Sequence, residues 1–263
     1  GISFAKPCFV RAGDYGDLAE CGLVVIAAGA NQKPGETRIE LLGRNRVIMS
    51  SIIEHLMAVN QSAVLLIVSN PVDVLTYMAQ KMSGLPAGQV IGSGTVLDTA
   101  RLKYLVGQHL NVDSRNVHAF IIGEHGDSEL AVWSSANISG VDLADYCRIT
   151  GKDDSFGAMQ RIYENVRDAA YSIIEGKGAT YYGIGMAVRR IAEAIVRDEH
   201  SVLPVSSMIS GHYGVDGICL GLPAVVGRNG AESVLDIPLS QDELFQLQSS
   251  AQKMKELIDE LGD

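Results

Sequence analysis

His125 lies in a short run of small and acidic residues, Gly-Glu-His-Gly-Asp at positions 123–127, directly after an apolar run at 117–122. A histidine titrates near neutral pH and can therefore give and take a proton within one catalytic cycle. The two glycines leave room for a ligand beside the imidazole, and the two carboxylates favour its protonated form. The run thus predicts a general acid and base, although taken alone it could be a structural turn.

Further polar residues could serve the same chemistry. Asp98 and Arg101 are three positions apart in a segment with helical spacing, so they share one helix face. Arg38 ends a polar loop, Asn70 follows an apolar run, and Thr180 precedes a helical segment. Each also has a structural interpretation. The charged pair could be a surface ion pair, Arg38 a solvated helix residue, Asn70 part of a turn, and Thr180 a helix N-cap.

The composition limits the classes of function. The 263 residues carry a formal net charge of −10, which disfavours nucleic acid and anionic membranes as partners. The four cysteines form no CxxC pair and no cluster with histidine. They indicate reduced thiols in the cytoplasm, with neither a metal site nor a disulfide framework. No apolar run reaches the roughly 18 residues that a membrane helix needs.

The first 93 residues alternate apolar runs with segments of helical spacing, which predicts a parallel sheet covered by helices. The expected strands are residues 8–11, 23–28, 63–68 and 89–91, and the expected helices are residues 17–21, 37–60 and 72–82. Pro71 at the start of the last helix agrees with this, because proline is tolerated in a first helical turn.

The remaining residues, 94–263, predict a second domain of the α+β class. Its expected helices are residues 96–110, 156–177, 180–197 and 239–261, and its expected strands are residues 117–122, 202–210 and 217–226. The last two strands should pair in an antiparallel hairpin. The sequence therefore predicts two domains, 1–93 and 94–263.

Four segments, in this order, resemble the L-lactate/L-malate dehydrogenase family, and within it the bacterial lactate dehydrogenases. They are Ala28 to Arg38 (AGANQKPGETR), Ile67 to Asp73 (IVSNPVD), Ile91 to Arg101 (IGSGTVLDTAR) and Ile121 to Asp127 (IIGEHGD). The resemblance runs through essentially the whole chain. It implies an NAD-dependent enzyme of the Rossmann type that transfers hydride between NADH and pyruvate and forms L-lactate.

The resemblance also implies catalytic roles. His125 is similar to the family's acid/base residue, which exchanges a proton with the substrate oxygen, and Asp98 is similar to its partner. Arg101 is similar to the clamp for the substrate carboxylate, since its planar fork matches a carboxylate with two hydrogen bonds. Arg38 is similar to the residue that polarises the ketone.

Gln32, Asn70 and Thr180 are similar to residues around the family's substrate. A neutral side chain at Gln32 implies pyruvate, because a second substrate carboxylate would be buried without a partner. Asn70 is similar to an asparagine near the carbonyl and nicotinamide, and Thr180 to part of the pocket wall. The loop at residues 31–36 resembles a lid that closes over the substrate.

The cofactor residues that the resemblance implies are Tyr15, Gly29, Ala30, Ser51, Val68, Asn70 and Ser93. Bacterial members are often activated by fructose 1,6-bisphosphate at a subunit interface, and the matching positions are Lys103 and His118. A lysine stands where the family pattern usually has arginine, so the charge is kept and the bidentate fork is lost. The resemblance further implies a homotetramer.

The sequence contains no strand followed by the G-x-G-x-x-G turn with which the family's NAD-binding domain begins. The expected fold class is therefore α/β: an N-terminally truncated Rossmann domain (a doubly wound parallel sheet without its first βαβ unit) followed by an α+β substrate domain. We expect the isolated chain to bind NAD weakly or not at all, because the turn holds the pyrophosphate. Two alternatives remain. The chain could be a non-catalytic remnant that associates with full-length subunits, or a related dehydrogenase of malate or 2-hydroxyisocaproate.

Overall fold

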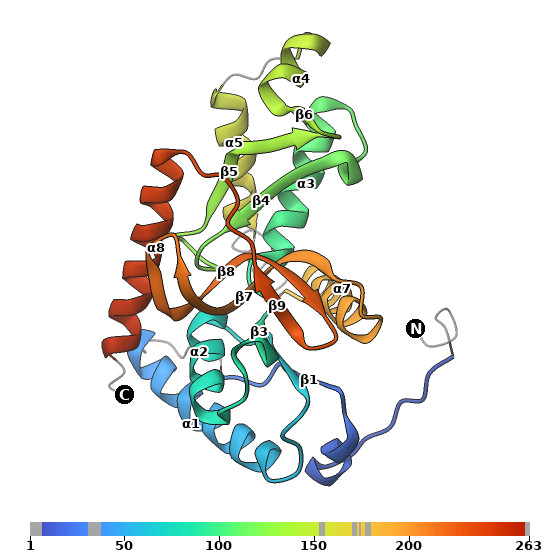
Figure 1. Ribbon diagram of the computed structural model, residues 1–263, viewed down its shortest axis with the longest axis vertical. Coiled ribbons are helices and arrows are strands. Elements are labelled where there is room, and N and C mark those ends of the chain that lie inside the picture. The colour runs from blue at the N-terminus through green and yellow to red at the C-terminus, as the bar shows by residue number, and fades with distance from the viewer. Residues whose placement is uncertain are drawn as a thin grey trace.

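Three short parallel strands begin the fold: β1 (Leu23–Ile26), β2 (Val64–Ile67) and β3 (Val90–Gly92). The computed structural model describes residues 7–30, 38–152, 156–169, 173, 175–176 and 180–260. Helices α1 (Arg38–Met57) and α2 (Val72–Ser83) connect the strands (Figure 1). All four residues of β2 are buried, as expected for a strand of a parallel sheet that helices cover on both faces.

The same sheet continues into the second half of the chain. β3 pairs with β7 (Ser201–His212), and β8 (Val215–Gly227) and β9 (Gly230–Val234) follow by antiparallel pairing. The strand order is β1-β2-β3-β7-β8-β9. Strands from both expected domains therefore share one mixed sheet, and the long hairpin of β7 and β8 confirms the predicted antiparallel pair.

Two glycines permit the contact between β3 and β7. Gly92 pairs with Ser206, and this is the one residue pair that joins the two strands. Gly94 has a φ of +49°, and a Cβ at this position would lie 2.5 Å from the backbone nitrogen of Ser206. A larger residue would have to push the strands apart, so glycine allows the two halves to meet.

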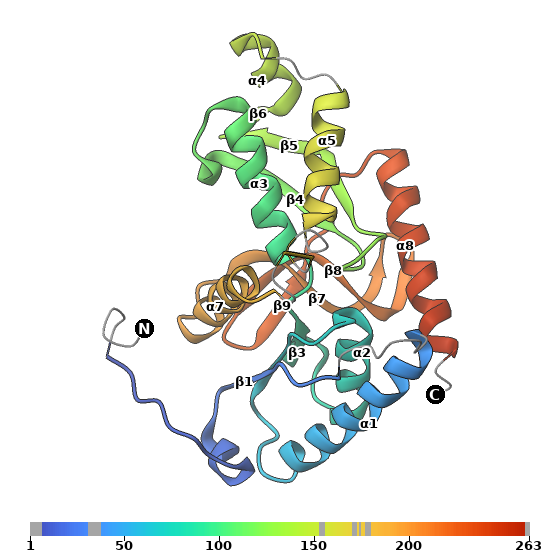
Figure 2. The same ribbon diagram turned by 180° about the vertical axis from the view of Figure 1, so that it is seen from behind.

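Successive side chains of β2 point to opposite faces of the sheet, and each face has its own helices. Val64 and Leu66 pack in a buried cluster with residues of α7 (Tyr182–Val196). Leu65 and Ile67 pack in a second cluster with residues of α1, α2 and α8 (Gln241–Glu260). Figure 2 shows α7 and α8 on different sides of the strands.

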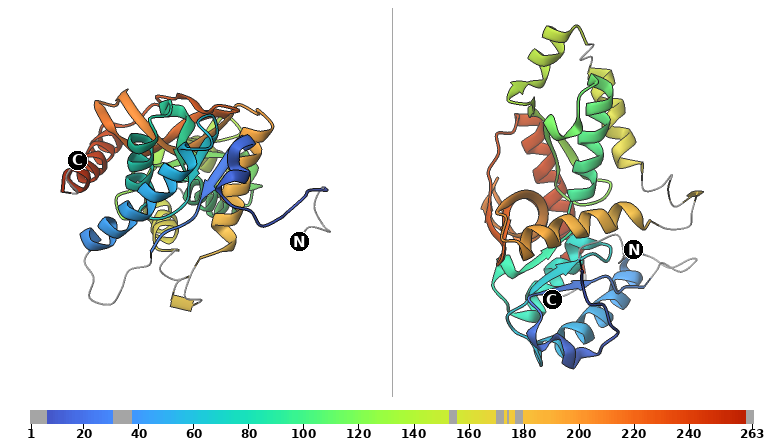
Figure 3. Two further views of the ribbon diagram at one scale, coloured as in Figure 1. Left: turned by 90° about the horizontal axis from the view of Figure 1, so that it is seen from below. Right: turned by 90° about the vertical axis from the view of Figure 1, so that its right-hand side faces the viewer.

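A smaller antiparallel sheet, β4-β5-β6, lies at the other end of the elongated molecule (Figures 1 and 3). Its elements and helices are β4 (Val117–Ile122), β5 (Leu130–Ile138), β6 (Val141–Asp142), α3 (Val96–Leu110), α4 (Leu143–Thr150) and α5 (Phe156–Arg167). The backbone nitrogen of Ile121 donates to Thr99 Oγ1 at 2.9 Å, which fixes α3 against β4. Short 3-10 helices complete the fold: η2 (Tyr15–Glu20), η3 (Ala87–Gln89) and η4 (Ser114–Asn116).

Several predicted elements differ from the structure. Residues 8–11 form no strand; they are exposed, and no described strand lies beside them to accept their hydrogen bonds. Residues 17–20 belong to the 3-10 helix η2 rather than to an α-helix, and Cys21 follows it as the C-cap. The helix predicted over residues 156–177 does not run on without a break, because α5 ends at Arg167 and Asp168 lies in a turn.

β1 is an edge strand among the described strands. β1 has one neighbour, β2, and Val25 is 41% exposed. Among the helices that the structure describes, none has the length and the apolar character needed to cross a membrane.

Candidate active site

The loop that carries His125 lies between β4 and β5, and three distant parts of the chain hold its backbone. Gly123, with a φ of +94°, exchanges two hydrogen bonds with Gly221 of β8, at 2.9 and 3.0 Å. The backbone nitrogen of Glu124 donates to Ser250 Oγ of α8 at 3.1 Å. The backbone nitrogen of His125 donates to Asp73 Oδ2 of α2 at 2.8 Å. The histidine is therefore placed by backbone contacts on both sides of it.

The side chain of His125 pairs with Asp98 at the start of α3. Nδ1 lies 2.7 Å from Asp98 Oδ2, the His125 side chain is 25% exposed, and the Asp98 side chain is 4% exposed. Burial lowers the pKa of His125, but the hydrogen bond and charge of Asp98, with Asp73 and Glu129, outweigh it and raise the pKa to about 9. With Nδ1–H donating to Asp98, Nε2 is the nitrogen that can exchange a proton with a ligand.

Arg101 contacts the other oxygen of the same carboxylate. Its Nη1 lies 3.3 Å from Asp98 Oδ1, and its side chain is 20% exposed. A Cβ on Gly183, in the first turn of α7, would lie 3.8 Å from Arg101 Nη2 and 3.2 Å from Leu97 Cδ1. The start of α7 thus lies close to the guanidinium. A positive helix end beside a guanidinium is suited to a small carboxylate.

Thr180 is half-buried and lies just before this helix. α7 begins at Tyr182 with Tyr181 as its N-cap, so the alternative in which Thr180 is the N-cap is wrong. The chain therefore brings Asp98, Arg101 and His125 into direct contact and places Thr180 beside the helix end that approaches Arg101.

Asp73 is a residue of this site that the sequence analysis did not assign. It is 2% exposed, and its two oxygens accept from His125 N and from Ser206 Oγ, the latter at 2.6 Å. Burial raises the pKa of Asp73 to about 6, against the opposing effect of these two hydrogen bonds. Asp73 thereby ties α2 and β7 to the histidine loop. The sequence signal was its place in the first turn of α2, directly after the Ser-Asn-Pro-Val segment.

We expect Ser206→Ala to lower the free energy of unfolding at pH 7 by about 1.5–3 kcal/mol, the usual contribution of a hydrogen bond to a charged group. Ser207 on the same strand is the matched control, because its buried Oγ has no hydrogen-bond partner among the described residues. Ser207→Ala should therefore cost almost nothing. Urea unfolding of both variants measures the difference. Equal losses would contradict the proposed importance of the Asp73 hydrogen bond.

Glu129 is a second residue that the sequence analysis missed. It is 5% exposed, and its carboxylate, that of Asp98 and the His125 ring offer ligand atoms that all lie within 4.8 Å of one another. Burial and the nearby Asp98 raise the pKa of Glu129 to about 8. Nothing in its local sequence distinguishes it from a surface glutamate before a strand, since the groups around it come from α3 and α5.

The described residues contain two groups of three side chains that could hold a metal ion. One consists of Asp98, His125 and Glu129, and the other of Asp198, His200 and Glu232. In the first group Arg101 already pairs with Asp98, so a cation would compete with a fixed positive charge. In the second group His200 is 55% exposed and lies 3.2 Å from Glu232, as in an ordinary surface ion pair.

Five of the cofactor residues implied by the resemblance lie where the parallel strands end. They are Gly29 and Ala30 after β1, Val68 and Asn70 after β2, and Ser93 after β3. The carboxyl ends of parallel strands share one edge, and nucleotides bind in the crevice there. A Cβ on Gly29 would lie 3.4 Å from Ser69 Cβ, and Asn70 is exposed, so small residues keep this edge open. The residues fit the nicotinamide end of a dinucleotide.

Tyr15 and Ser51 form a separate group against α1. The Tyr15 ring stacks on the His55 ring with centroids 5.0 Å apart, and His55 Nδ1 lies 2.7 Å from the Ser51 carbonyl oxygen. Gln32 and the predicted lid at residues 31–36 lie outside the described residues. Arg38 is the first residue of α1, so its backbone is placed but its side chain is not described.

The two residues expected to bind fructose 1,6-bisphosphate lie on neighbouring elements. Lys103 is on α3, and burial lowers its pKa. His118 is exposed on β4, opposite Asn137 of β5. The hydrogen bond from Ile121 N to Thr99 Oγ1 holds these two elements together.

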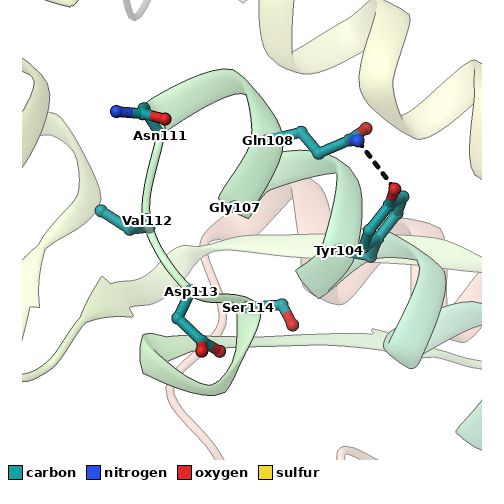
Figure 4. Close-up of a pocket in the computed structure, with 7 residues that line it drawn as sticks. All are labelled: Tyr104, Gly107, Gln108, Asn111, Val112, Asp113 and Ser114. Carbon is teal, nitrogen blue, oxygen red and sulfur yellow. Dashed lines mark hydrogen bonds between the residues drawn. The ribbon is translucent and has the colours of Figure 1, made fainter.

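A hollow of about 510 Å³ lies at the C-terminal end of α3, apart from the residues above (Figure 4). It is lined by Tyr104, Gly107, Gln108, Asn111, Val112, Asp113 and Ser114. Gln108 Nε2 donates to the Tyr104 hydroxyl at 2.7 Å, and Asp113 pairs with Arg115 at 2.7 Å. Gln108, Tyr104 and Asp113 already bond to other protein groups. None of the predicted catalytic residues lines the hollow.

Comparison with known sequence families gives two matches that together span almost the whole chain. The family described as lactate/malate dehydrogenase, NAD binding domain, matches residues 2–92. The family described as lactate/malate dehydrogenase, alpha/beta C-terminal domain, matches residues 95–262.

Individual relatives agree with this. The chain is 53% identical to L-lactate dehydrogenase of Thermoanaerobacter sp. (strain X514), over 99% of this chain and 84% of the relative. It is 48% identical to L-lactate dehydrogenase 1 of Clostridium acetobutylicum, over 99% and 83%.

Two solved structures have the same fold. MGS-M5, a lactate dehydrogenase from a Medee basin deep-sea metagenome library, is 46% identical with a TM-score of 0.94, covering 98% of this chain and 82% of that one. The minor L-lactate dehydrogenase from Enterococcus mundtii in its ligands-bound form is 39% identical with a TM-score of 0.91, covering 95% and 79%. On these grounds, together with the fold and the contacts around His125, the chain belongs to the lactate/malate dehydrogenase family.

Proposed function

We propose that this protein catalyses the NAD-dependent interconversion of pyruvate and L-lactate. The observation that carries the proposal is that Asp98 touches both His125 and Arg101, one through each carboxylate oxygen. In this proposal His125 is the proton donor, and Arg101 beside it binds the substrate carboxylate. Reduction of a 2-oxo acid requires both groups. Close relatives named L-lactate dehydrogenase support the same function.

Each of these residues has a separate role in the proposed reaction. Arg101 binds the carboxylate of pyruvate with two parallel hydrogen bonds. His125 donates a proton from Nε2 to the carbonyl oxygen, and Asp98 stabilises the imidazolium and fixes the ring. Arg38 polarises the ketone, and Thr180 forms part of the pocket wall. NADH, when bound, would supply the hydride to the carbonyl carbon, while the carbonyl oxygen takes the proton of His125.

The cofactor would bind at the carboxyl ends of β1, β2 and β3. Gly29, Val68, Asn70 and Ser93 would hold the nicotinamide end, and Ala30 belongs to the same edge, while Tyr15 and Ser51 would contact the rest of the dinucleotide. We assign the NAD-binding domain to residues 1–93 and the catalytic and substrate domain to residues 94–263, with Gln32, Arg38 and Asn70 reaching the substrate from the first domain. The two family matches, over residues 2–92 and 95–262, support this division.

The protonation state of His125 favours pyruvate reduction at neutral pH. Burial lowers the pKa of His125, but Asp98 outweighs this effect and raises it to about 9, so the imidazole carries its proton below that value. Reduction needs the protonated form. The rate should therefore be level at neutral pH and fall as the pH rises through about 9.

Gln32 and Lys103 carry the finer proposals. A neutral Gln32 favours pyruvate over oxaloacetate, because its uncharged amide would not offset the charge of a second carboxylate. Lys103 and His118 would bind fructose 1,6-bisphosphate in a homotetramer. Sedimentation with and without fructose 1,6-bisphosphate tests this assembly. A monomer whose sedimentation does not change when the ligand is added would contradict it.

We place the protein in the cytoplasm. The four cysteines, all free in the structure, support a reducing compartment.

NADH oxidation by pyruvate tests the main proposal. It should be followed on this chain and on a version extended at its N-terminus by a family-type βαβ unit carrying the G-x-G-x-x-G turn, which this sequence does not contain. We expect NADH consumption that depends on pyruvate, with L-lactate as the product, in at least the extended version. Folded proteins that bind NADH but leave pyruvate unchanged would favour a non-catalytic associate of full-length subunits.

A further inference from the structure

Glu129 places an unused carboxylate beside the catalytic pair. It is 5% exposed, and its Oε1 is buried with no hydrogen-bond partner among the described residues. Its backbone is fixed on both sides, because its nitrogen donates to the Gly126 carbonyl at 3.2 Å and its carbonyl accepts from the Tyr163 hydroxyl. A buried acceptor without a partner costs free energy, so its retention here calls for a function.

Charged groups from three parts of the chain lie near the carboxyl group of Glu129. α3 contributes Asp98 and Arg101, the histidine loop contributes His125, and α5 contributes Arg167 beside Tyr163. The carboxylate of Asp98 opposes ionisation of Glu129, whereas the three cations favour it. One ligand atom each of Asp98, His125 and Glu129 lies within 4.8 Å of the other two, close enough for strong mutual interaction.

We propose that Glu129 is a positioning residue that ionises as the pH rises and then holds the proton on His125. This proposal rests on the proposed function, because His125 must be protonated to reduce pyruvate. At neutral pH Glu129 is a neutral acid and leaves the pair of His125 and Asp98 alone. At alkaline pH it becomes a carboxylate, and its new charge stabilises the imidazolium when the imidazolium would otherwise lose its proton.

The direction of the effect follows from the burial and charges around both groups. Burial and the nearby charge of Asp98 raise the pKa of Glu129 to about 8, so Glu129 gains its negative charge at alkaline pH. A negative Glu129 raises the pKa of His125, as Asp98 and Asp73 also do. Glu129 therefore extends pyruvate reduction to higher pH without changing the reaction below pH 7.

Glu129→Gln imitates the neutral acid with almost the same shape, which makes it the informative variant. We expect kcat/KM for pyruvate to stay within about twofold of the wild type at pH 6–7, where Glu129 is already neutral. Above pH 8 the alkaline limb should move down by about one pH unit, and the rate should fall about tenfold near pH 9–10. Glu129→Asp keeps a carboxylate and should retain most of the alkaline activity.

Two controls separate this effect from a structural one. Glu256→Gln removes a negative charge from the exposed face of α8 and should leave the whole profile unchanged. Nuclear magnetic resonance of the imidazole protons reports the titration of His125 without any turnover, and His125→Asn identifies its signal among the six histidines. In Glu129→Gln this titration should move to lower pH.

The outcomes are distinguishable. A profile lowered by the same factor at every pH, with an unmoved His125 titration, would overturn the proposal and leave Glu129 a packing residue. If Glu129→Gln moves the titration of His125 while the wild type reduces no pyruvate, the electrostatic proposal holds and the proposed function fails. Activity near wild type at pH 6–7 itself shows that the variant is folded.

Discussion

His125→Asn should lower kcat for pyruvate reduction about 10²- to 10⁴-fold, the usual contribution of a positioned general acid. Asparagine can occupy the site and keep the backbone hydrogen bond to Asp73, but it has no proton that titrates near neutral pH. The loss should appear in kcat, because the proton is transferred in the transition state and not on binding. Initial rates of NADH oxidation at saturating pyruvate measure it.

His200→Asn is the matched control for this variant. His200 is 55% exposed, and its backbone has a φ of +52°, a conformation that asparagine adopts readily. We expect its kcat to remain within about twofold of the wild type, as is usual for a surface substitution. If His125→Asn keeps more than about a tenth of the wild-type kcat, general acid catalysis by His125 is wrong.

Arg101→Lys should raise KM for pyruvate about 10²-fold, since truncating one partner of a buried charge pair usually costs about 2–5 kcal/mol. Lysine keeps the positive charge but loses the planar fork, so it cannot make two parallel hydrogen bonds to a carboxylate. The shorter reach would also weaken the contact with Asp98, which is 3.3 Å from Nη1 in the wild type. A complete dependence of rate on pyruvate concentration gives KM and kcat separately.

Arg197→Lys makes the same change at the surface. Arg197 is 51% exposed and pairs with Glu193 one helical turn earlier, and such pairs contribute little. Its KM should equal that of the wild type. A KM for Arg101→Lys within about threefold of this control would mean that the substrate carboxylate binds elsewhere, because a single charged hydrogen bond already contributes more.

Local sequence patterns were sufficient to predict the bounds of a helix or strand whose apolar residues recur regularly along one continuous segment. α3 and β4 have the predicted bounds, 96–110 and 117–122, because each presents a clear apolar periodicity. β5, β6, α4 and β9 were not predicted. In β5 the serines Ser134 and Ser135 interrupt the apolar residues, and Glu243 of α8 accepts hydrogen bonds from the backbone at Trp133 and Ser134. A partner so distant in sequence leaves no local signal.

The residues of the candidate site also divide into those that the sequence predicts and those that only the fold reveals. His125, Asp98 and Arg101 could be predicted as a set through the family resemblance of the segments that carry them, and in the structure Asp98 contacts both His125 and Arg101. Asp73 and Glu129 could not, since one acts through a backbone nitrogen and the other through burial. Both depend on how α2, α3 and α5 pack around the loop, which only the folded chain reveals.

The most direct test of the central claim is a comparison of kcat/KM for pyruvate, oxaloacetate and 2-ketoisocaproate, measured in parallel with NADH on the chain and on its extended version. We expect pyruvate to be preferred over each of the others by at least about tenfold, which corresponds to roughly 1.4 kcal/mol of transition-state binding. A preference for oxaloacetate would indicate a malate dehydrogenase, and a preference for 2-ketoisocaproate would indicate a pocket for bulkier side chains. Either result would contradict the assignment of pyruvate as the substrate.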